Sequence, residues 1–242
     1  MKKSKANYVS EFLLSLFFPN RCCFCNELTE PTRYICDECD KALPYIQNDI
    51  CFLCGAEKSK CKCRKSTGHY FEKICAPLYY EGSVKTCIHN FKFNDKKLNY
   101  KCLAELMRKC CEERYRDICF DYITYIPMRK RNLKKRGYNQ SGLLAEFLSD
   151  SMNIPLADDM LIKLYNTKNQ HDCGYFERTG NLFGVFDVNK KYNLENKNIL
   201  LVDDIITTGS TLSECGKMLY LNGAQHVYCI AAALRCEEEG DE

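Results

Sequence analysis

The residues best suited to chemistry lie in one stretch of the chain, Ile199–Thr211. Two adjacent carboxylates, Asp203 and Asp204, follow a short apolar run, and a hydroxyl-rich turn comes next. That turn consists of Thr207, Thr208, Gly209, Ser210 and Thr211. Carboxylates accept hydrogen bonds from a sugar diol or hold Mg²⁺, and a turn that opens a helix offers free backbone N–H groups to a phosphate. The stretch therefore predicts a ribose-phosphate site rather than a simple acidic helix cap.

The elements that must position these residues can be read from the same stretch. The continuous apolar run Ile199–Val202 is typical of a strand buried on both faces of a parallel sheet. We expect Asp203 and Asp204 where that strand ends. A helix follows the turn, because Leu212, Cys215 and Leu219 recur at helical spacing. The sequence thus predicts an α/β fold with a parallel sheet flanked by helices.

A second candidate segment, Met128–Gln140, is rich in Lys and Arg and follows the predicted strand Asp121–Pro127. Open α/β sheets place ligands at the C-terminal ends of their strands, and Arg offers a two-pronged donor that matches phosphate oxygens. We therefore interpret this segment as a pyrophosphate loop that uses Arg129, Arg131 and Arg136. An ordinary charged loop and a nonspecific DNA contact are the alternatives.

Nineteen cysteines indicate metal binding in a chain expected in a reducing cytosol. Eight of them come in four close pairs near the N-terminus: Cys22 and Cys25, Cys36 and Cys39, Cys51 and Cys54, Cys61 and Cys63. Four thiolates complete a closed tetrahedral zinc site, so these pairs predict structural zinc. Sequential pairing would give two sites, and a cross-braced pairing stays open. Cys23 is a spare that would compete with Cys22, and Cys102 is expected to be a small core hydrophobe.

Length and composition set the frame for these sites. The chain has 242 residues, 45% of them hydrophobic, and a net charge of +3. We expect residues 1–68 to form an N-terminal helix and zinc-ribbon module, residues 69–236 a catalytic domain, and residues 237–242 an acidic tail. The apolar run Phe12–Phe18 is too short to span a bilayer and lacks a small-residue cleavage site. We interpret it as a helix that packs on the body of a cytoplasmic protein.

The stretch Ile199–Thr211 resembles the phosphoribosyl pyrophosphate signature of type I phosphoribosyltransferases, with its apolar run, two acids and Thr-Thr-Gly-x-Thr. Further motifs resemble the ComF family of competence-related, phosphoribosyltransferase-like proteins. They are the cysteine module, Arg136–Gln140, and the spaced residues Thr167, Gln170, Arg178, Asn181 and Phe186. Two positions depart from that pattern, because Tyr165-Asn166 stands where an Arg is expected and Met128-Arg129 replaces a small or His-containing pair.

The resemblance implies a type I phosphoribosyltransferase-like fold behind an N-terminal double zinc ribbon. It implies that Asp203 and Asp204 hold the ribose hydroxyls of phosphoribosyl pyrophosphate with Mg²⁺, and that Thr207–Thr211 anchor its 5-phosphate. A flap over the site would include Gln170 and Arg178. The family link is to DNA uptake in natural transformation, with single-stranded DNA and the DNA-uptake helicase machinery as partners.

Three functions stay open at this point. The first is a phosphoribosyltransferase, in which positioning and leaving-group stabilisation provide the catalysis. The second is a non-catalytic module that binds single-stranded DNA through the ribose-phosphate site. The third is a sensor of phosphoribosyl pyrophosphate. The acceptor, the oligomeric state and the number of zinc ions do not follow from the sequence.

Overall fold

The computed structural model describes residues 21–30, 33–47, 49–63, 68–93, 99–164 and 185–236. The expected helix over Phe12–Phe18, the flap residues Gln170 and Arg178, and the tail at 237–242 lie outside the described residues. The fold is therefore built here from the cysteine-rich segment, the sheet and its helices.

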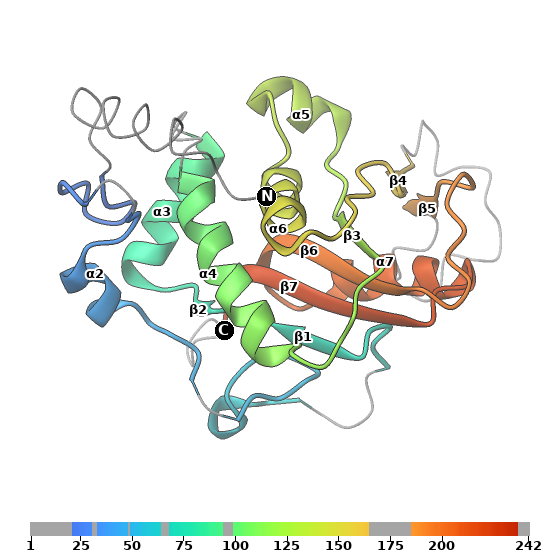
Figure 1. Cartoon of the computed structure of the whole chain (residues 1–242), viewed down its shortest axis with the longest axis horizontal. Helices are drawn as coiled ribbons and strands as arrows, with labels where there is room; N and C mark the ends of the chain where they lie inside the picture. The colour runs from blue at the N-terminus through green and yellow to red at the C-terminus, as the bar shows by residue number, and fades with distance from the viewer. Residues whose placement is uncertain are drawn as a thin grey trace, which may run out of the picture.

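A parallel sheet forms the centre of the molecule (Figure 1). Its neighbouring strands are, in order, β1 (Lys73–Cys75), β7 (His226–Leu234), β6 (Asn198–Ile206) and β3 (Tyr122–Tyr125), and β2 (Leu78–Tyr79) also pairs with β7. The apolar run of β6 is fully buried, as expected for a strand covered on both faces. Since β6 lies between β7 and β3, its C-terminal end is flanked by the ends of two other parallel strands.

Helices cover the sheet. In Figure 1, α4 (Asn99–Arg114) and α6 (Gln140–Met152) lie in front of the strands, and α7 (Ser210–Leu221) lies behind them. A Cβ at Gly216 of α7 would come within 1.9 Å of the backbone oxygen of Tyr70, so glycine is needed for this close approach. The predicted α/β class, a parallel sheet flanked by helices, is confirmed.

Two predicted boundaries are wrong near the candidate site. The strand β6 does not end at Val202, because β7 continues to pair with it through Asp203 and up to Ile206. The basic segment is not a loop throughout: α5 (Lys130–Arg136) forms within it and ends at Gly137, which adopts a left-handed φ of 77°. Lys, Arg and Leu favour helix, and glycine is the usual residue at such an end.

The remaining elements differ from the expected pattern in detail. The segment Ile74–Tyr80 does not form one continuous strand, because β1 ends at Cys75 and β2 begins at Leu78. The helix α3 (Gly82–Phe93) follows β2 and ends close to the C-terminal end of β6. A short antiparallel pair, β4 (Leu161–Lys163) and β5 (Phe186–Val188), flanks the segment that was expected to form the flap.

The cysteine-rich segment packs directly on the body. It contains α2 (Asp37–Ala42) and a 3₁₀ turn, η1 (Lys58–Lys60). Its residues Leu43, Ile46 and Ile50 are buried within the same apolar cluster as the sheet. The backbone N–H of Ile74 in β1 donates to the oxygen of Phe52 at 3.0 Å. This segment therefore contributes to the core, and the domain boundary at residue 68 stays a prediction.

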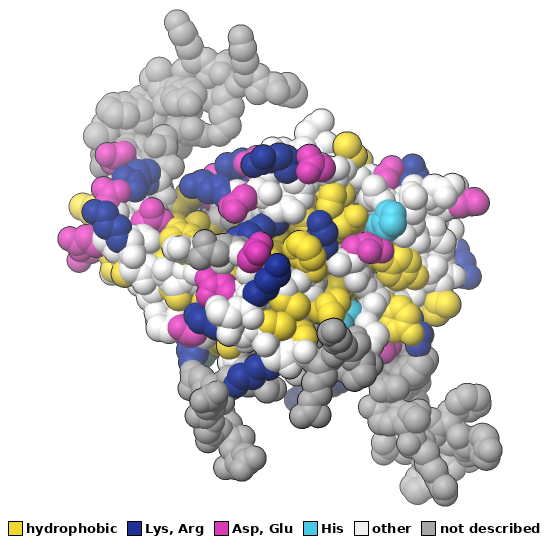
Figure 2. Space-filling model, turned by 90° about the horizontal axis from the view of Figure 1, so that it is seen from below, with side chains coloured by type: hydrophobic (Ala, Val, Ile, Leu, Met, Phe, Trp, Pro, Cys, Tyr) yellow, Lys and Arg dark blue, Asp and Glu magenta, His cyan; other side chains and the backbone are white. Residues whose placement is uncertain are grey.

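The surface carries a mixture of charges. On the face seen in Figure 2, basic and acidic side chains are interspersed among apolar ones, which fits the small net charge of +3. Among the described helices, none is long and apolar enough to cross a membrane.

Candidate functional site

The acid pair lies in the last half of β6, held by groups from two helices. Ser141 of α6 donates from Oγ to Asp203 Oδ1 at 2.9 Å, and the backbone N–H of Asp204 donates to the same oxygen at 2.8 Å. Lys92 of α3 places Nζ 2.7 Å from Asp204 Oδ2. Desolvation and the nearby charge of Asp204 raise the pKa of Asp203 to about 7. Asp203 can therefore change its charge near neutral pH.

The turn after β6 has the geometry of an anion-binding loop. Gly209 adopts a left-handed φ of 73° and forms the N-cap of α7 without a side-chain cap. Thr207, Thr208 and Ser210 are exposed, and the hydroxyls of Thr208 and Ser210 hydrogen-bond to each other. The helix α7 has 12 residues and begins directly after Gly209. Its N-terminal N–H groups and the positive end of its dipole therefore lie at this turn. These groups can bind a phosphate one short step from the two carboxylates.

The three predicted pyrophosphate arginines lie on or beside α5. Arg129 is the N-cap residue of α5, and both it and Arg131 are exposed. Arg136 is less exposed and donates from a guanidinium nitrogen to Gln140 Oε1 at 3.1 Å. Because β3 is paired with β6, this basic helix follows the strand next to the acid pair, at the same edge of the sheet.

Three site residues were missed or only partly recognised from the sequence. Ser141 was not predicted, and no spacing signal connects it to Asp203. Lys92 lies in none of the motifs predicted to form the site, and it reaches Asp204 from α3. Lys163 of β4 is part-buried; burial lowers its pKa, as does the charge of Arg129, and Asp203 acts in the opposite direction. The charges of both Arg129 and Asp203 therefore act on Lys163.

One buried donor at the site has no partner. The side chain of Gln140, the first residue of α6, is only 1% exposed. Within the described part of the chain its Nε2 has no hydrogen-bond partner, although its Oε1 accepts from Arg136. A buried N–H left without an acceptor costs free energy, and the described residues supply no acceptor for this one.

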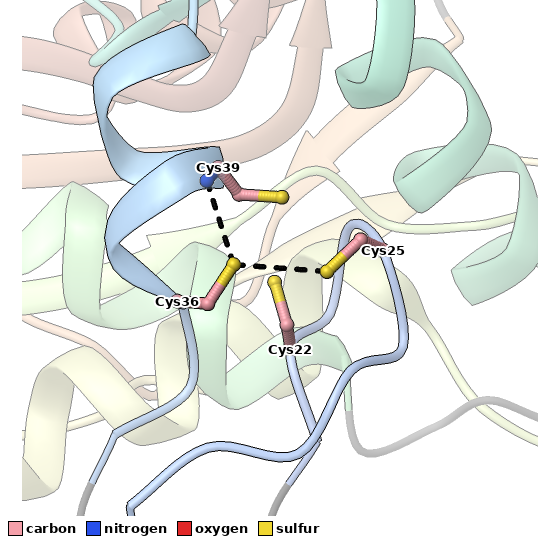
Figure 3. Close-up of side chains that lie close together, drawn as sticks. All are labelled: Cys22, Cys25, Cys36 and Cys39. Atoms are coloured by element: carbon pink, nitrogen blue, oxygen red, sulfur yellow. Dashed lines mark hydrogen bonds between the residues drawn. The ribbon is translucent and has the colours of Figure 1, made fainter.

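The paired cysteines converge into two clusters of four. One contains Cys22, Cys25, Cys36 and Cys39 (Figure 3), and the other contains Cys51, Cys54, Cys61 and Cys63. Within each cluster all sulfurs lie within 4.8 Å of one another. This is the sequential grouping, not the cross-braced one.

The sulfur spacing fits tetrahedral zinc. The distance is 3.7 Å both from Cys25 Sγ to Cys36 Sγ and from Cys54 Sγ to Cys61 Sγ. A Zn–S bond of about 2.3 Å gives a tetrahedral edge of roughly 3.8 Å. At Cys22, burial raises the thiol pKa, but backbone N–H donors outweigh it and lower that pKa to about 7. Both clusters therefore fit structural zinc with no open coordination position.

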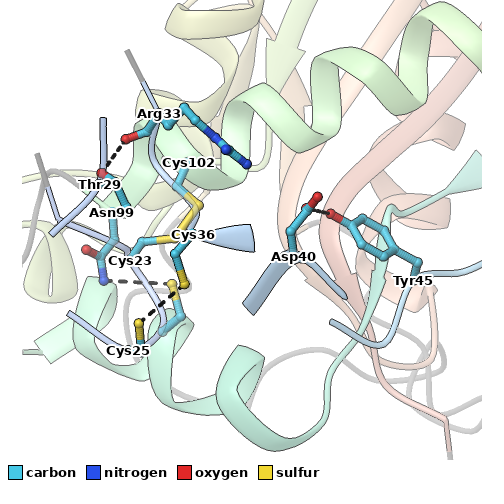
Figure 4. Close-up of a disulfide and its surroundings, with 10 residues drawn as sticks. Cys23, Cys25, Thr29, Arg33, Cys36, Asp40, Tyr45, Asn99 and Cys102 are labelled. Atoms are coloured by element: carbon cyan, nitrogen blue, oxygen red, sulfur yellow. Dashed lines mark hydrogen bonds between the residues drawn. A yellow bond between two sulfur atoms is a disulfide. The ribbon is translucent and has the colours of Figure 1, made fainter. Parts of the chain in front are cut away.

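Cys23 and Cys102 are joined in a disulfide (Figure 4). The expectations that Cys102 is a simple core hydrophobe and that Cys23 competes with Cys22 for metal are therefore wrong. The reason is tertiary: the loop of the first cluster packs against α4, and Cys23 points toward α4 instead of into the cluster. The bond ties the first ribbon to the body across 79 residues of sequence.

The fold and the site define a phosphoribosyltransferase-type domain joined to a double zinc ribbon. A family model described as "Double zinc ribbon domain" matches residues 13–77, and one described as "Phosphoribosyl transferase domain" matches residues 139–242. The second match includes the acid pair Asp203 and Asp204, the candidate phosphate turn Thr207–Thr211, and α7. This turn is called the phosphate turn below.

Several curated proteins match most of the chain, across both of these parts. The chain is 28% identical to "Competence protein F" of Haemophilus influenzae over 87% of this chain and 95% of that protein. It is 28% identical to "Competence protein ComFC" of Bacillus subtilis over 81% and 82% of the two chains. The "DNA utilization protein YhgH" of Escherichia coli K12 is 25% identical over 88% of this chain and 90% of that protein. The resemblance to the ComF family is confirmed.

Among solved structures, an adenine phosphoribosyltransferase aligns with a TM-score of 0.39 and 16% identity, over 57% of this chain and 71% of that chain.

Proposed function

We propose that this protein binds phosphoribosyl pyrophosphate, or a related ribose phosphate, with Mg²⁺ and acts as a phosphoribosyltransferase in DNA uptake. The observation that carries the proposal is the connection from β6 to α7. It presents two part-buried carboxylates and the N-terminus of α7, whose N-cap Gly209 has no capping side chain, within one short stretch, Asp203–Ser210. The names of the competence and DNA utilization relatives support the link to DNA uptake.

The acid pair would bind the ribose hydroxyls. Each hydroxyl donates to a carboxylate, and the 5-phosphate accepts from backbone N–H groups in the first turn of α7. The Ser210 N–H donates to Thr208 Oγ1 at 3.3 Å, so a phosphate would replace that bond. Ser141 orients Asp203, and Lys92 neutralises Asp204 until the ligand arrives. Two adjacent carboxylates supply oxygen ligands, which fit a hard divalent cation. Bound there, Mg²⁺ would help neutralise the leaving pyrophosphate.

The basic helix would stabilise the leaving group. Pyrophosphate departs with its electron pair from the sugar C1, and charge-assisted donors aimed at it lower the barrier. Arg129 and Arg131 are exposed and can turn toward a ligand. Lys163 adds a further positive charge near Asp203. The residues Gln170 and Arg178 remain predicted flap contacts.

Calorimetry with phosphoribosyl pyrophosphate and Mg²⁺ tests the binding step. The double variant Asp203→Asn, Asp204→Asn removes both negative charges and replaces one acceptor oxygen of each side chain by a donor, so it is expected to abolish binding. Asp117→Asn, an exposed aspartate just after α4, is the matched control and keeps wild-type affinity. Unchanged affinity in the double variant would refute the assignment. A pyrophosphate-release assay against a panel of bases, amines and single-stranded DNA then tests turnover.

A second candidate is a non-catalytic module that binds single-stranded DNA through the same ribose-phosphate site. The exposure of α5, with basic residues along its seven-residue length, favours this candidate. Saturable DNA binding without pyrophosphate release selects it, whereas turnover selects the enzyme. The DNA-uptake helicase machinery stays a predicted partner under both functions.

A further inference from the structure

A cavity of about 430 Å³ opens beside the phosphate turn, on the side away from α5. Thr207, Thr208 and Gly209 of the turn line it, and so do Cys54 and Cys63 of the second cysteine cluster. This volume lies in the usual range for small-ligand pockets. The cavity therefore joins the second zinc ribbon to the candidate ribose-phosphate site.

The floor of the cavity is apolar. Two residues of the second ribbon, Leu53 and Ala56, line it together with Ile74 of β1, Ile206 of β6 and Leu234 of β7. All except Leu53 are buried, and Leu53 is 39% exposed. Flat apolar surfaces of this kind accept an aromatic ring, because ring burial removes apolar area from water.

The polar part of the lining is basic. Lys60, Lys62 and Arg235 border the cavity, and none of the described lining residues is Asp or Glu. Lys60 is partly offset, because Nζ lies 3.6 Å from Glu57 Oε2, behind the lining. Arg235 is the sharpest feature: its backbone N–H donates to the oxygen of Ile206 at 2.8 Å, and its side chain is exposed. This bond fixes Arg235 directly beside the start of the phosphate turn.

We propose that this cavity binds a planar aromatic ring together with a negative group, which the ring carries directly or through a sugar, next to the ribose phosphate. The ring would lie on the apolar floor, and its anion would face Arg235 and the ribbon lysines. The second zinc ribbon thereby forms a wall of the ligand site in addition to its structural role. This inference rests on the proposed function, since the ring is the ligand or acceptor beside the ribose-phosphate site.

Two sources share this chemistry, namely a free aromatic acid and a nucleotide. Each is tested by calorimetry on the zinc-loaded full chain with a matched pair of probes: orotate against uracil, and dTMP against thymidine. We expect the anionic member of at least one pair to bind at least about tenfold more tightly than its neutral counterpart. Preference within the first pair identifies a free acid, and preference within the second pair alone identifies a nucleotide.

Arg235→Glu is the decisive variant, because it reverses the charge beside the turn without changing a buried residue. It is expected to weaken the anionic probe at least about tenfold. Arg116→Glu, an exposed position near the C-terminal end of α4, is the control and leaves binding unchanged. The proposal is overturned when neither pair shows an anion preference or when Arg235→Glu has no effect.

The proposed function fails separately. It is judged by ribose 5-phosphate binding with Mg²⁺, which the Asp203→Asn, Asp204→Asn variant should lose. Orotate binding should survive in that variant, because neither carboxylate lines the cavity. If the wild type does not bind ribose 5-phosphate, the proposed function is refuted, whereas the orotate experiment still tests the cavity.

Discussion

Lys92 Nζ lies 2.7 Å from Asp204 Oδ2, and the two side chains are only 20% and 16% exposed. The last turn of α3 is thereby fixed to the C-terminal end of β6. The Lys92 ammonium group pairs directly with Asp204 before any ligand binds. A ligand that brings Mg²⁺ must therefore compete with Lys92 for Asp204.

Loss of Lys92 should destabilise the fold. Lys92→Met keeps most of the side-chain volume but leaves Asp204 without its partner. Removing one member of a part-buried pair strands the other charge, so we expect a loss of about 1–3 kcal/mol in the free energy of unfolding by urea. Lys197→Met is the control, because Lys197 and Asp121 are 2.9 Å apart but 37% and 33% exposed. That change should cost about 0–1 kcal/mol, and equal losses in the two variants would contradict the prediction.

Ligand affinity should depend on the charge of Asp203. Its pKa is raised to about 7, first by desolvation and then by Asp204. The carboxylate accepts hydrogen bonds from a ribose diol with two oxygens only when ionised. Affinity for ribose 5-phosphate with Mg²⁺ should therefore rise as the pH increases through 7. Calorimetry on Asp203→Asn supplies the control, since any rise that persists there belongs to the phosphate of the ligand.

The same group should make stability fall with increasing pH. Its folded pKa of about 7 lies above the ordinary value of 3.8, so the folded state binds more protons between these values. The contribution of Asp203 to stability is full below pH 4 and is lost as the pH rises through 7. Asp203→Asn should thus gain in melting temperature over the wild type at pH 8 and not at pH 4. An equal gain at both values would show that ionisation of Asp203 is not the cause.

The connection from β6 to α7 could be predicted because its signals are local. The sequence shows four apolar residues, two acids and a hydroxyl-rich turn in direct succession, and each can be recognised from residue type alone. The extension of β6 to Ile206 could not be predicted, since it depends on pairing with β7. The helix α5 was not predicted, because Lys and Arg suit a phosphate-binding loop as well as a helix.

The residues that complete the site are distant in sequence. Ser141 reaches Asp203 across 62 residues, and the sulfur of Cys23 reaches Cys102 across 79. No periodic pattern in the sequence predicts either contact. The position of Arg235 beside the phosphate turn could not be predicted either, because it depends on the register between β6 and β7.

Zinc content should follow the two clusters independently. We expect two zinc ions per chain by elemental analysis, one for each set of four sulfurs. Cys25→Ser should remove one ion and Cys54→Ser the other, because a closed site loses affinity when a thiolate is removed. Cys119→Ser, an exposed cysteine outside both clusters, is the control and keeps both ions. A chain that holds both ions after either ligand change would contradict the assignment.

The basic helix α5 should account for the salt dependence of single-stranded DNA binding. Arg131 and Lys134 are both exposed on it, so the double change Arg131→Glu, Lys134→Glu removes two possible phosphate contacts without disturbing the core. Each contact to a single strand contributes about 0.7 to the slope of log affinity against log salt, so the slope should become shallower by roughly 1.4. The measurement is fluorescence anisotropy of a short oligothymidylate at several salt concentrations. Lys109→Glu with Arg116→Glu, an equal charge reversal on and just after α4, is the control. If both double variants lower the slope equally, the strand responds to net charge alone, and α5 is not its contact surface.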